Sequence, residues 1–128
     1  MPRRQAIYVS GFAHGNPIPA ACRIGNIVTT GVINGVDPAT GEFPDTLDAQ
    51  CVFLFQQVEA IVRAAGGTMD DIIKMTVWMK DSSQREPLNR VWLSVFPDEA
   101  TRPARHTLQI PLAGKRLIQC DFTAVLED

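Results

Sequence analysis

The stretch DAQCVFLFQQVEAIVRAAGGTMDDIIKMTVWMK, residues 48–80, carries two hydrophobic periods in succession. Its first part repeats apolar residues at the i, i+3, i+4, i+7 spacing of an amphipathic helix. We expect this helix to run from about Thr46 to Ala65, because Asp45 or Thr46 can cap its start and Gly66-Gly67 supply a left-handed stop. Its predicted buried face consists of Leu47, Cys51, Leu54, Phe55, Val58, Ile61, Val62 and Ala65.

The second part of the stretch, residues 72–80, alternates with a period of two, which predicts a strand. The apolar residues Ile73, Met75, Val77 and Met79 share one side of this strand. Trp78 falls on the other side among polar neighbours. Either something covers that face too, or the tryptophan is partly exposed.

A second helix is predicted from about Ser83 to Phe96. Ser83 and Glu86 have the spacing of a capping box, and a stripe of apolar residues follows. That stripe consists of Leu88, Val91, Trp92, Val95 and Phe96.

Strands are predicted on both sides of this central part. Residues 20–33, AACRIGNIVTTGVI, indicate two short strands that turn at Gly25-Asn26, and residues 5–11 can add another. Residues 105–110 and 116–126 indicate two more, which the segment PLAGKR joins as a plausible antiparallel hairpin. The order β-β-α-β-α-β-β predicts an α+β sandwich with both helices on one face of the sheet. At 128 residues we expect one domain, residues 1–128.

Composition limits the function classes. With a net charge of -2 and only short basic pairs, the chain offers no field for nucleic acid. No apolar run is long enough for a membrane span and no secretory signal is apparent, so a cytoplasmic protein is expected. Three scattered cysteines and two histidines without ligand spacing predict neither a disulfide framework nor a metal site, and no cofactor is expected.

One arginine needs an explanation. In RPARHTLQIP, residues 102–111, Arg105 begins a predicted strand. By alternation Arg105 and Thr107 point to a polar face, while His106, Leu108 and Ile110 would point to the helices. Arg105 can pair with an acidic residue across the predicted hairpin, namely Asp121, and then nothing binds there. Alternatively, its planar guanidinium group binds a ligand carboxylate through two parallel hydrogen bonds.

Several segments together resemble one family. They are GNIVTTGVINGVDPATGE, DAQCVFLFQQVEAIVRAAGGTMDDIIKMTVWMKD, LNRVWLSVF, RPARHTLQIP and LIQCDFTAV. In this order and spacing they are similar to the RidA family, the reactive-intermediate (imine/enamine) deaminases also called YjgF. The resemblance implies a chorismate-mutase-like α+β fold with two helices on one face of a mixed sheet. It also implies a homotrimer with active sites between subunits, and hydrolysis of small 2-imino or 2-enamino carboxylates to 2-oxo acids and ammonia without a metal or organic cofactor.

The resemblance assigns roles to four residues. Arg105 takes the place of the arginine in the family's PAR motif and would clamp the substrate carboxylate. Gly31 would line the pocket with its backbone. Thr107 stands where the family often has cysteine and would keep the backbone contacts. Asn89 corresponds to the helix asparagine, although a cap or a surface polar role is an equal alternative for it.

Two further positions, Gln119 and Ile18, depart from the family pattern. Gln119 stands where a glutamate is thought to order the hydrolytic water. An amide oxygen can orient water but cannot take its proton. Asp121 shares the face of Gln119 and can compensate, but it lies roughly 6.6 Å further along the strand, and pairing with a basic group is its other interpretation. Ile18 replaces the pocket tyrosine and makes the pocket more apolar. His14 either donates a proton at the cleft mouth or is a surface residue.

The sequence therefore predicts a deaminase of 2-imino or 2-enamino carboxylates, which can be dedicated to one pathway as aminomuconate-type deaminases are. The alternative is a non-catalytic protein of the same fold that binds or senses a small carboxylate. A ribonuclease or translation inhibitor ranks third, because the charge and the two histidines do not favour it.

Overall fold

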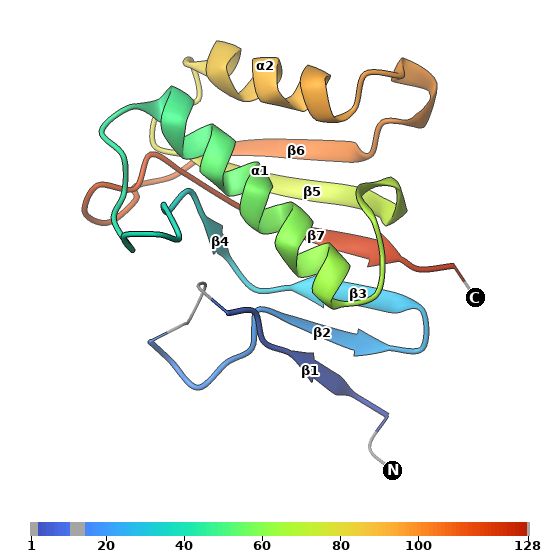
Figure 1. Cartoon of the computed structure of the whole chain (residues 1–128). Coiled ribbons are helices and arrows are strands. Elements are labelled where there is room, and N and C mark those ends of the chain that lie inside the picture. Colours follow the sequence, from blue (N-terminus) through green and yellow to red (C-terminus); the bar gives the residue numbers. More distant parts are fainter. Residues whose placement is uncertain (1–2, 11–14, 128) are drawn as a thin grey trace.

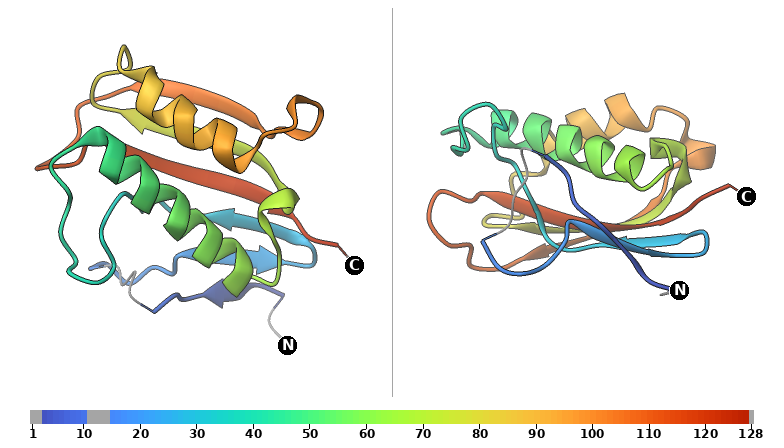
Figure 2. Two further views of the ribbon diagram at one scale, coloured as in Figure 1. Left: turned by 45° about the horizontal axis from the view of Figure 1, so that its top comes forward. Right: turned by 60° about the horizontal axis from the view of Figure 1, so that its bottom comes forward.

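Two helices cover one face of a mixed sheet in the computed structural model, which describes residues 3–10 and 15–127 (Figure 1). Figure 2 shows that both helices lie on the same side of the sheet, and no helix of the described residues covers its other side. The strand order is β1-β2-β3-β7-β5-β6, and β4 also pairs with β7. This confirms the predicted α+β class. The helices are α1 (Leu47–Ala64) and α2 (Arg85–Val95), and the strands are β1 (Gln5–Ile7), β2 (Ala21–Ile24), β3 (Ile27–Thr30), β4 (Ile33–Asn34), β5 (Ile72–Met79), β6 (Ala104–Gln109) and β7 (Ile118–Val125).

Helix α1 begins and ends as its sequence predicts. The side chain of Thr46 accepts a hydrogen bond from the Ala49 amide at 3.2 Å. After the last turn Gly66 adopts a φ of 98°, which only glycine takes without strain. The buried positions of α1 include the predicted Cys51, Leu54, Phe55, Val58, Ile61 and Val62.

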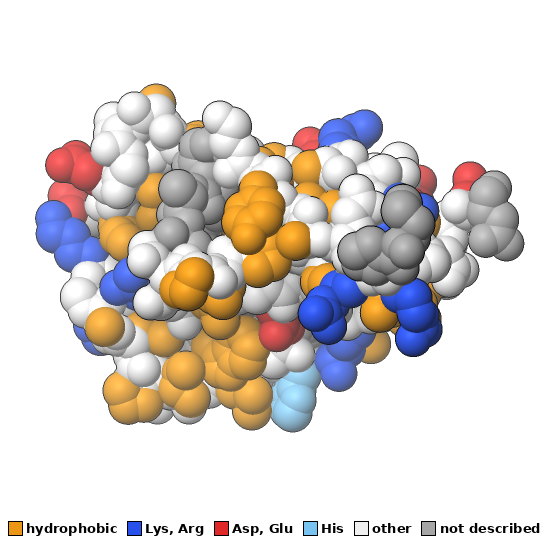
Figure 3. Space-filling model, turned by 90° about the horizontal axis from the view of Figure 1, so that it is seen from below, with side chains coloured by type: hydrophobic (Ala, Val, Ile, Leu, Met, Phe, Trp, Pro, Cys, Tyr) orange, Lys and Arg blue, Asp and Glu red, His pale blue; other side chains and the backbone are white. Residues whose placement is uncertain are grey.

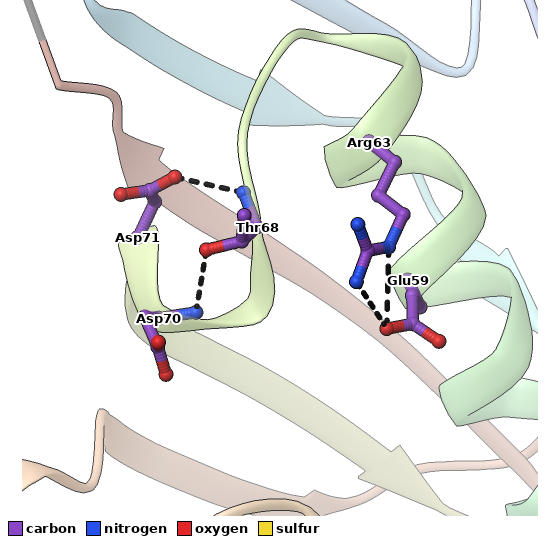
Figure 4. A network of polar contacts seen from close by, with 5 residues as sticks. All are labelled: Glu59, Arg63, Thr68, Asp70 and Asp71. Atoms are coloured by element: carbon purple, nitrogen blue, oxygen red, sulfur yellow. Dashed lines mark hydrogen bonds and ion pairs between the residues drawn. The ribbon is translucent and has the colours of Figure 1, made fainter.

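A short hydrogen-bonded turn connects α1 to β5 (Figure 4). The Thr68 amide donates to Oδ2 of Asp71 at 2.8 Å, and the Asp70 amide donates to the Thr68 hydroxyl at 3.3 Å. These bonds close the 3-10 helix Met69–Asp71. The nearby ion pair between Arg63 and Glu59, 3.3 Å long, is solvent-exposed. Such a pair contributes at most about 0.5 kcal/mol, so the turn rather than the pair fixes this connection.

Strand β5 lies inside the sheet, antiparallel to β7 and parallel to β6. Its buried side is Met75, Val77 and Met79, as predicted. The prediction that Ile73 shares this side was wrong, because Ile73 is 53% exposed. A register shift between Ile72 and Lys74 inserts one extra residue there, and such a bulge reverses the alternation.

The predicted hairpin of the last two strands is also wrong. Strand β5 lies between β6 and β7, so these two strands do not pair. Helix α2 instead provides the crossover that parallel β5 and β6 require. The turn-like segment 111–116 therefore passes the end of β5 instead of closing a hairpin.

The faces assigned to β6 were inverted. Arg105 lies beside Met75 and Thr107 beside Val77, so both side chains are on the helix-covered face. Leu108 and Ile110 are on the open face, where they are 36% and 37% exposed. Because β6 is an edge strand that only α2 covers, its polar side chains can face the helix without entering the central core.

Helix α2 begins two residues later than expected, and the predicted capping box does not form. Gln84 is the N-cap and makes no side-chain hydrogen bond to the helix. Ser83 is bound elsewhere, since its amide and its hydroxyl both donate to Oδ1 of Asp81, at 3.0 and 2.6 Å. This local Asp–Ser turn competes with capping and leaves Arg85 as the first helical residue.

A buried glutamine fixes the loops beside α1. Gln50 is fully buried, and its amide nitrogen donates to the carbonyl oxygens of Pro44 and Lys115, both at 2.9 Å. Its amide oxygen accepts from the Leu117 amide at 3.0 Å. Gly35 approaches so closely that a Cβ atom there would overlap the Gln50 backbone. One side chain thus holds two loops that are far apart in the sequence.

The open face of the sheet is rich in apolar side chains. Hydrophobic side chains gather along the lower side of Figure 3, which is the side away from the helices. Trp78 is half-buried on this face, so it is neither core nor fully exposed. Exposed apolar residues of the sheet strands include Ile24, Ile27, Leu108 and Val125. Among the described residues, no helix has the length and apolar character to cross a bilayer.

Candidate active site

Arg105 is held by two side chains of α2. One guanidinium nitrogen, Nη2, donates to Oδ1 of Asn89 at 2.8 Å. Its Cζ atom lies 4.9 Å from the centre of the Trp92 ring, a cation–π arrangement. The other nitrogen, Nη1, is buried without a hydrogen-bond partner among the described residues. The guanidinium is therefore oriented but keeps a donor for a ligand.

No carboxylate of the described residues pairs with Arg105. The predicted ion pair with Asp121 does not form, because Asp121 lies beside Thr76 on the open face and Arg105 lies on the other. Burial, and after it the charge of Arg85, lower the pKa of the Arg105 guanidinium. An arginine in this environment is stabilised by any anion that reaches it.

Thr107 places its backbone at the free edge of the sheet. The amide of Ile110 donates to the carbonyl oxygen of Met79 at 3.1 Å, so the backbone of Ile110 faces β5. Successive residues of a strand direct their amide groups to alternate sides. The backbone groups of Thr107 and Arg105 hence point away from β5, toward the open edge, where a ligand can bond to them.

Gly31 and Ile18 line a different hollow. It measures about 60 Å³ and is also lined by Tyr8, Gln57 and Ile61. The Gly31 amide already donates to the Ala20 carbonyl at 3.0 Å. A Cβ atom on Gly31 would make only ordinary contacts, at 3.8 Å or more. The fold would therefore tolerate a side chain at this position, and the absence of one leaves space in the hollow. His14, expected near this region, lies outside the described residues.

Gln119 and Asp121 are on the open face of β7. The Gln119 amide nitrogen donates to Oδ1 of Asn34 at 2.8 Å, and its oxygen has no hydrogen-bond partner in the described part of the chain. Burial raises the pKa of the Asp121 carboxyl, against a hydrogen bond from the Thr76 backbone and the charge of Lys74. The pair thus combines a free amide oxygen with a carboxylate that binds protons more readily than usual.

Within one chain the predicted site residues form three separate groups. Arg105, Thr107 and Asn89 are together at the β6 edge, Gly31 and Ile18 line the hollow, and the Gln119–Asp121 pair is on the open face. Strands β3 and β6 are three strand spacings apart, roughly 14 Å. One chain alone therefore does not assemble the predicted pocket.

Three further residues belong to this description and were not predicted as site residues. Trp92 was assigned only to the apolar stripe of α2, yet it stacks on Arg105. Arg85 is near enough to lower the pKa of Arg105. Asn34 orients Gln119. The spacing Arg85, Asn89, Trp92 is i, i+4, i+7, so the helical period alone could have placed them on one face.

Two of the three cysteines, Cys51 and Cys120, are buried, and the third, Cys22, is partly exposed. Burial raises the pKa of the Cys51 thiol to about 12, and burial also raises the pKa of Cys120. Neither is a thiolate at neutral pH. No three side chains of His, Cys, Asp and Glu gather as metal ligands in residues 3–10 and 15–127.

The chain is a small protein with a two-layer α+β fold and an oriented arginine at the edge of its sheet. The sequence model of the endoribonuclease L-PSP family matches residues 4–125, and the chain belongs to this family, which is also known as the RidA or YjgF family.

Relatives with described roles agree with this assignment. The 2-iminobutanoate/2-iminopropanoate deaminase of Escherichia coli K12 is 36% identical over 88 residues, which is 68% of this chain and 69% of that protein. A RutC family protein of Aquifex aeolicus is 28% identical over 97% of this chain and 88% of its own length. The crystal structure of Escherichia coli TdcF with bound serine superposes with a TM-score of 0.85 at 31% identity, covering 96% of this chain and all of the other.

Proposed function

We propose that the protein hydrolyses small 2-imino or 2-enamino carboxylates to 2-oxo acids and ammonia. The observation that carries this is Arg105, which Asn89 and Trp92 orient and which keeps a buried, unpaired nitrogen. A substrate carboxylate bonds to that guanidinium. A relative named as an imine deaminase and a similar structure with bound serine, itself a small carboxylate, support this choice.

The reaction needs water, a site for the carboxylate and a place for one proton. Water adds its oxygen to C2 of the imine, and a proton goes to the nitrogen. The hydroxyl proton of the tetrahedral intermediate is then transferred to the nitrogen, the C2–N bond breaks, and ammonia and the 2-oxo acid are released. An enamine first becomes the imine by gaining a proton on carbon and losing one from nitrogen.

The residues divide these tasks. The oxygen of Gln119 accepts a hydrogen bond from the attacking water, and Asp121 takes its proton. Thr107 offers backbone groups at the sheet edge, and Gly31 and Ile18 close the apolar end. Positioning alone accelerates the hydrolysis of a labile imine.

The complete site forms between chains of a homotrimer. The separation of the three groups in one chain and the apolar open face of the sheet support this assembly. A cyclic oligomer brings the β6 edge of one chain against a different surface of the next. Arg105, Asn89 and Thr107 of one subunit then meet the Gly31 hollow of its neighbour.

The test is the rate of 2-oxo acid formation from freshly generated 2-aminoacrylate and 2-iminobutanoate. Arg105→Ala is expected to lower kcat/KM at least about 100-fold, because a charged bidentate contact is lost. Gln119→Glu is expected to raise the rate by restoring a base beside the water. Arg63→Lys, at an exposed ion pair on α1, is the matched control and stays near the native rate.

A non-catalytic carboxylate-binding protein is the second candidate, and the neutral Gln119 favours it. Calorimetric titration with 2-oxobutanoate distinguishes the two. Binding that depends on Arg105, with no acceleration of either imine by the native trimer, would replace the deaminase with the binder.

A further inference from the structure

Three residues share one face of α2, and two of them contact Arg105 of β6. Arg85, Asn89 and Trp92 are spaced i, i+4, i+7 and therefore share a helical face. Asn89 bonds to the Arg105 guanidinium at 2.8 Å and Trp92 stacks on it at 4.9 Å. Arg85 continues the same face by one turn toward the start of the helix.

The direction of α2 relative to β6 places Thr107 between the two arginines. Ser82, just before α2, donates from its amide to the side chain of Gln109 at the end of β6, at 2.9 Å. At the other end, Arg102 before β6 donates to the carbonyl oxygen of Phe96 after α2, at 2.9 Å. The two elements thus run antiparallel. Because Arg85 lies one helical turn before Asn89, Thr107, two residues after Arg105 on β6, lies on the side of Arg105 that faces Arg85.

Among residues 3–10 and 15–127, neither Arg85 nor Arg105 forms an ion pair with an acidic side chain. The ion pairs among the described residues join Arg63 to Glu59 and Arg90 to Asp48 and Glu86. Glu86, next to Arg85 in sequence, bonds to Arg90 at 2.6 Å instead. Arg85 is also the first residue of α2, where the helix dipole disfavours a cation.

The electrostatics agree with this geometry. The charge of Arg85, together with burial, lowers the pKa of Arg105, so the two guanidinium groups repel one another. These two arginines lie along the same side of α2 and β6 and have no carboxylate partner among the described residues. Their charge is compensated best by a ligand that is negative at both ends.

We propose that the substrate is a dicarboxylate: Arg105 binds the carboxylate beside the imine carbon, and Arg85 binds a second carboxylate at the far end of the molecule. Four helical residues separate Asn89 from Arg85, a rise of roughly 6 Å. A chain of about five or six carbons spans this distance over Thr107. This rests on the proposed deaminase function and narrows its substrate class.

The experiment compares two imines produced in the assay by an amino-acid oxidase. One is 2-iminoglutarate, with two carboxylates, and the other is 2-iminobutanoate, with one. For the native protein we expect kcat/KM to be at least about tenfold higher with 2-iminoglutarate than with 2-iminobutanoate. This is the effect expected of one additional charged hydrogen bond. Arg85→Gln lowers this ratio by about tenfold, whereas Arg63→Gln leaves it within about twofold.

A native ratio near one, or a ratio that Arg85→Gln does not change, overturns the proposal. If neither imine is accelerated, the deaminase function fails and calorimetry decides the dicarboxylate question separately. Tighter binding of 2-oxoglutarate than of 2-oxobutanoate, lost in Arg85→Gln, supports the dicarboxylate site. Equal binding of the two oxo acids overturns it.

Discussion

Asp121 shows how one side chain acquires unusual chemistry from its position in a sheet. It is on the open face of β7 beside Thr76, partly shielded from water. Burial disfavours the charged carboxylate and so raises its pKa, which the Thr76 backbone and Lys74 only partly oppose. The folded protein therefore binds a proton at Asp121 more tightly than the unfolded chain does.

We predict that Asp121→Asn stabilises the protein at pH 7. A raised folded pKa means that this group favours folding at low pH, and that this contribution is lost as pH rises through the folded pKa. At pH 7 the ionised carboxylate is thus a small penalty, below about 1 kcal/mol because water screens it. Thermal unfolding should give a higher Tm for the variant at pH 7 and no difference at pH 3. A lower Tm at pH 7 would contradict the assignment.

The role of Arg105 as a carboxylate clamp stays a prediction. The sequence drew attention to the residue, because a guanidinium at the head of an apolar strand needs a partner. It did not identify the partners, since Asn89 and Trp92 contact it only through the crossover between β5 and β6. Both the ion pair with Asp121 and the assigned face were wrong for this reason.

At the scale of elements, α1 acts as the anchor for two loops. The side chain of Gln50 bonds both to the segment before α1 and to the segment before β7. The buried face of α1, which is mostly apolar, carries this polar residue because three backbone groups need it. The amphipathic pattern does not distinguish such a residue from an exposed glutamine.

We predict that Gln50→Leu lowers the free energy of unfolding by about 3 kcal/mol, because it leaves buried backbone groups without partners. Urea unfolding monitored by tryptophan fluorescence measures this. Gln56→Leu, at an exposed position of the same helix, is the control and should change it by no more than about 0.5 kcal/mol. Equal effects of the two substitutions would show that the loops do not depend on Gln50.

At the scale of the whole molecule, the fold separates residues that the proposed reaction needs together. The β6 edge and the Gly31 hollow are on different parts of one chain. An assembly in which each site takes one group from each of two chains makes activity a property of the oligomer.

We predict that two inactive variants complement each other. Arg105→Ala removes the carboxylate clamp and Gly31→Val fills the hollow. With equal co-expression and random assembly, about a third of the sites in each mixed trimer, and about a quarter of all sites when homotrimers are included, combine an intact clamp with an intact hollow. Deaminase activity should return to roughly that fraction of native. Mixed trimers, verified by native mass spectrometry, that remain inactive would place both groups in one chain.

The sequence by itself determined the element types, the α1 boundaries and the first hairpin. These follow from local periods, caps and turns, which need no knowledge of distant residues. Only the tertiary structure decided that β5 separates β6 from β7 and that Arg105 lies on the helix-covered face of the sheet. It also decided that Arg85 is near enough to influence Arg105. Strand order and register depend on contacts between segments far apart in the chain, and a shift by one residue exchanges the two faces of a strand.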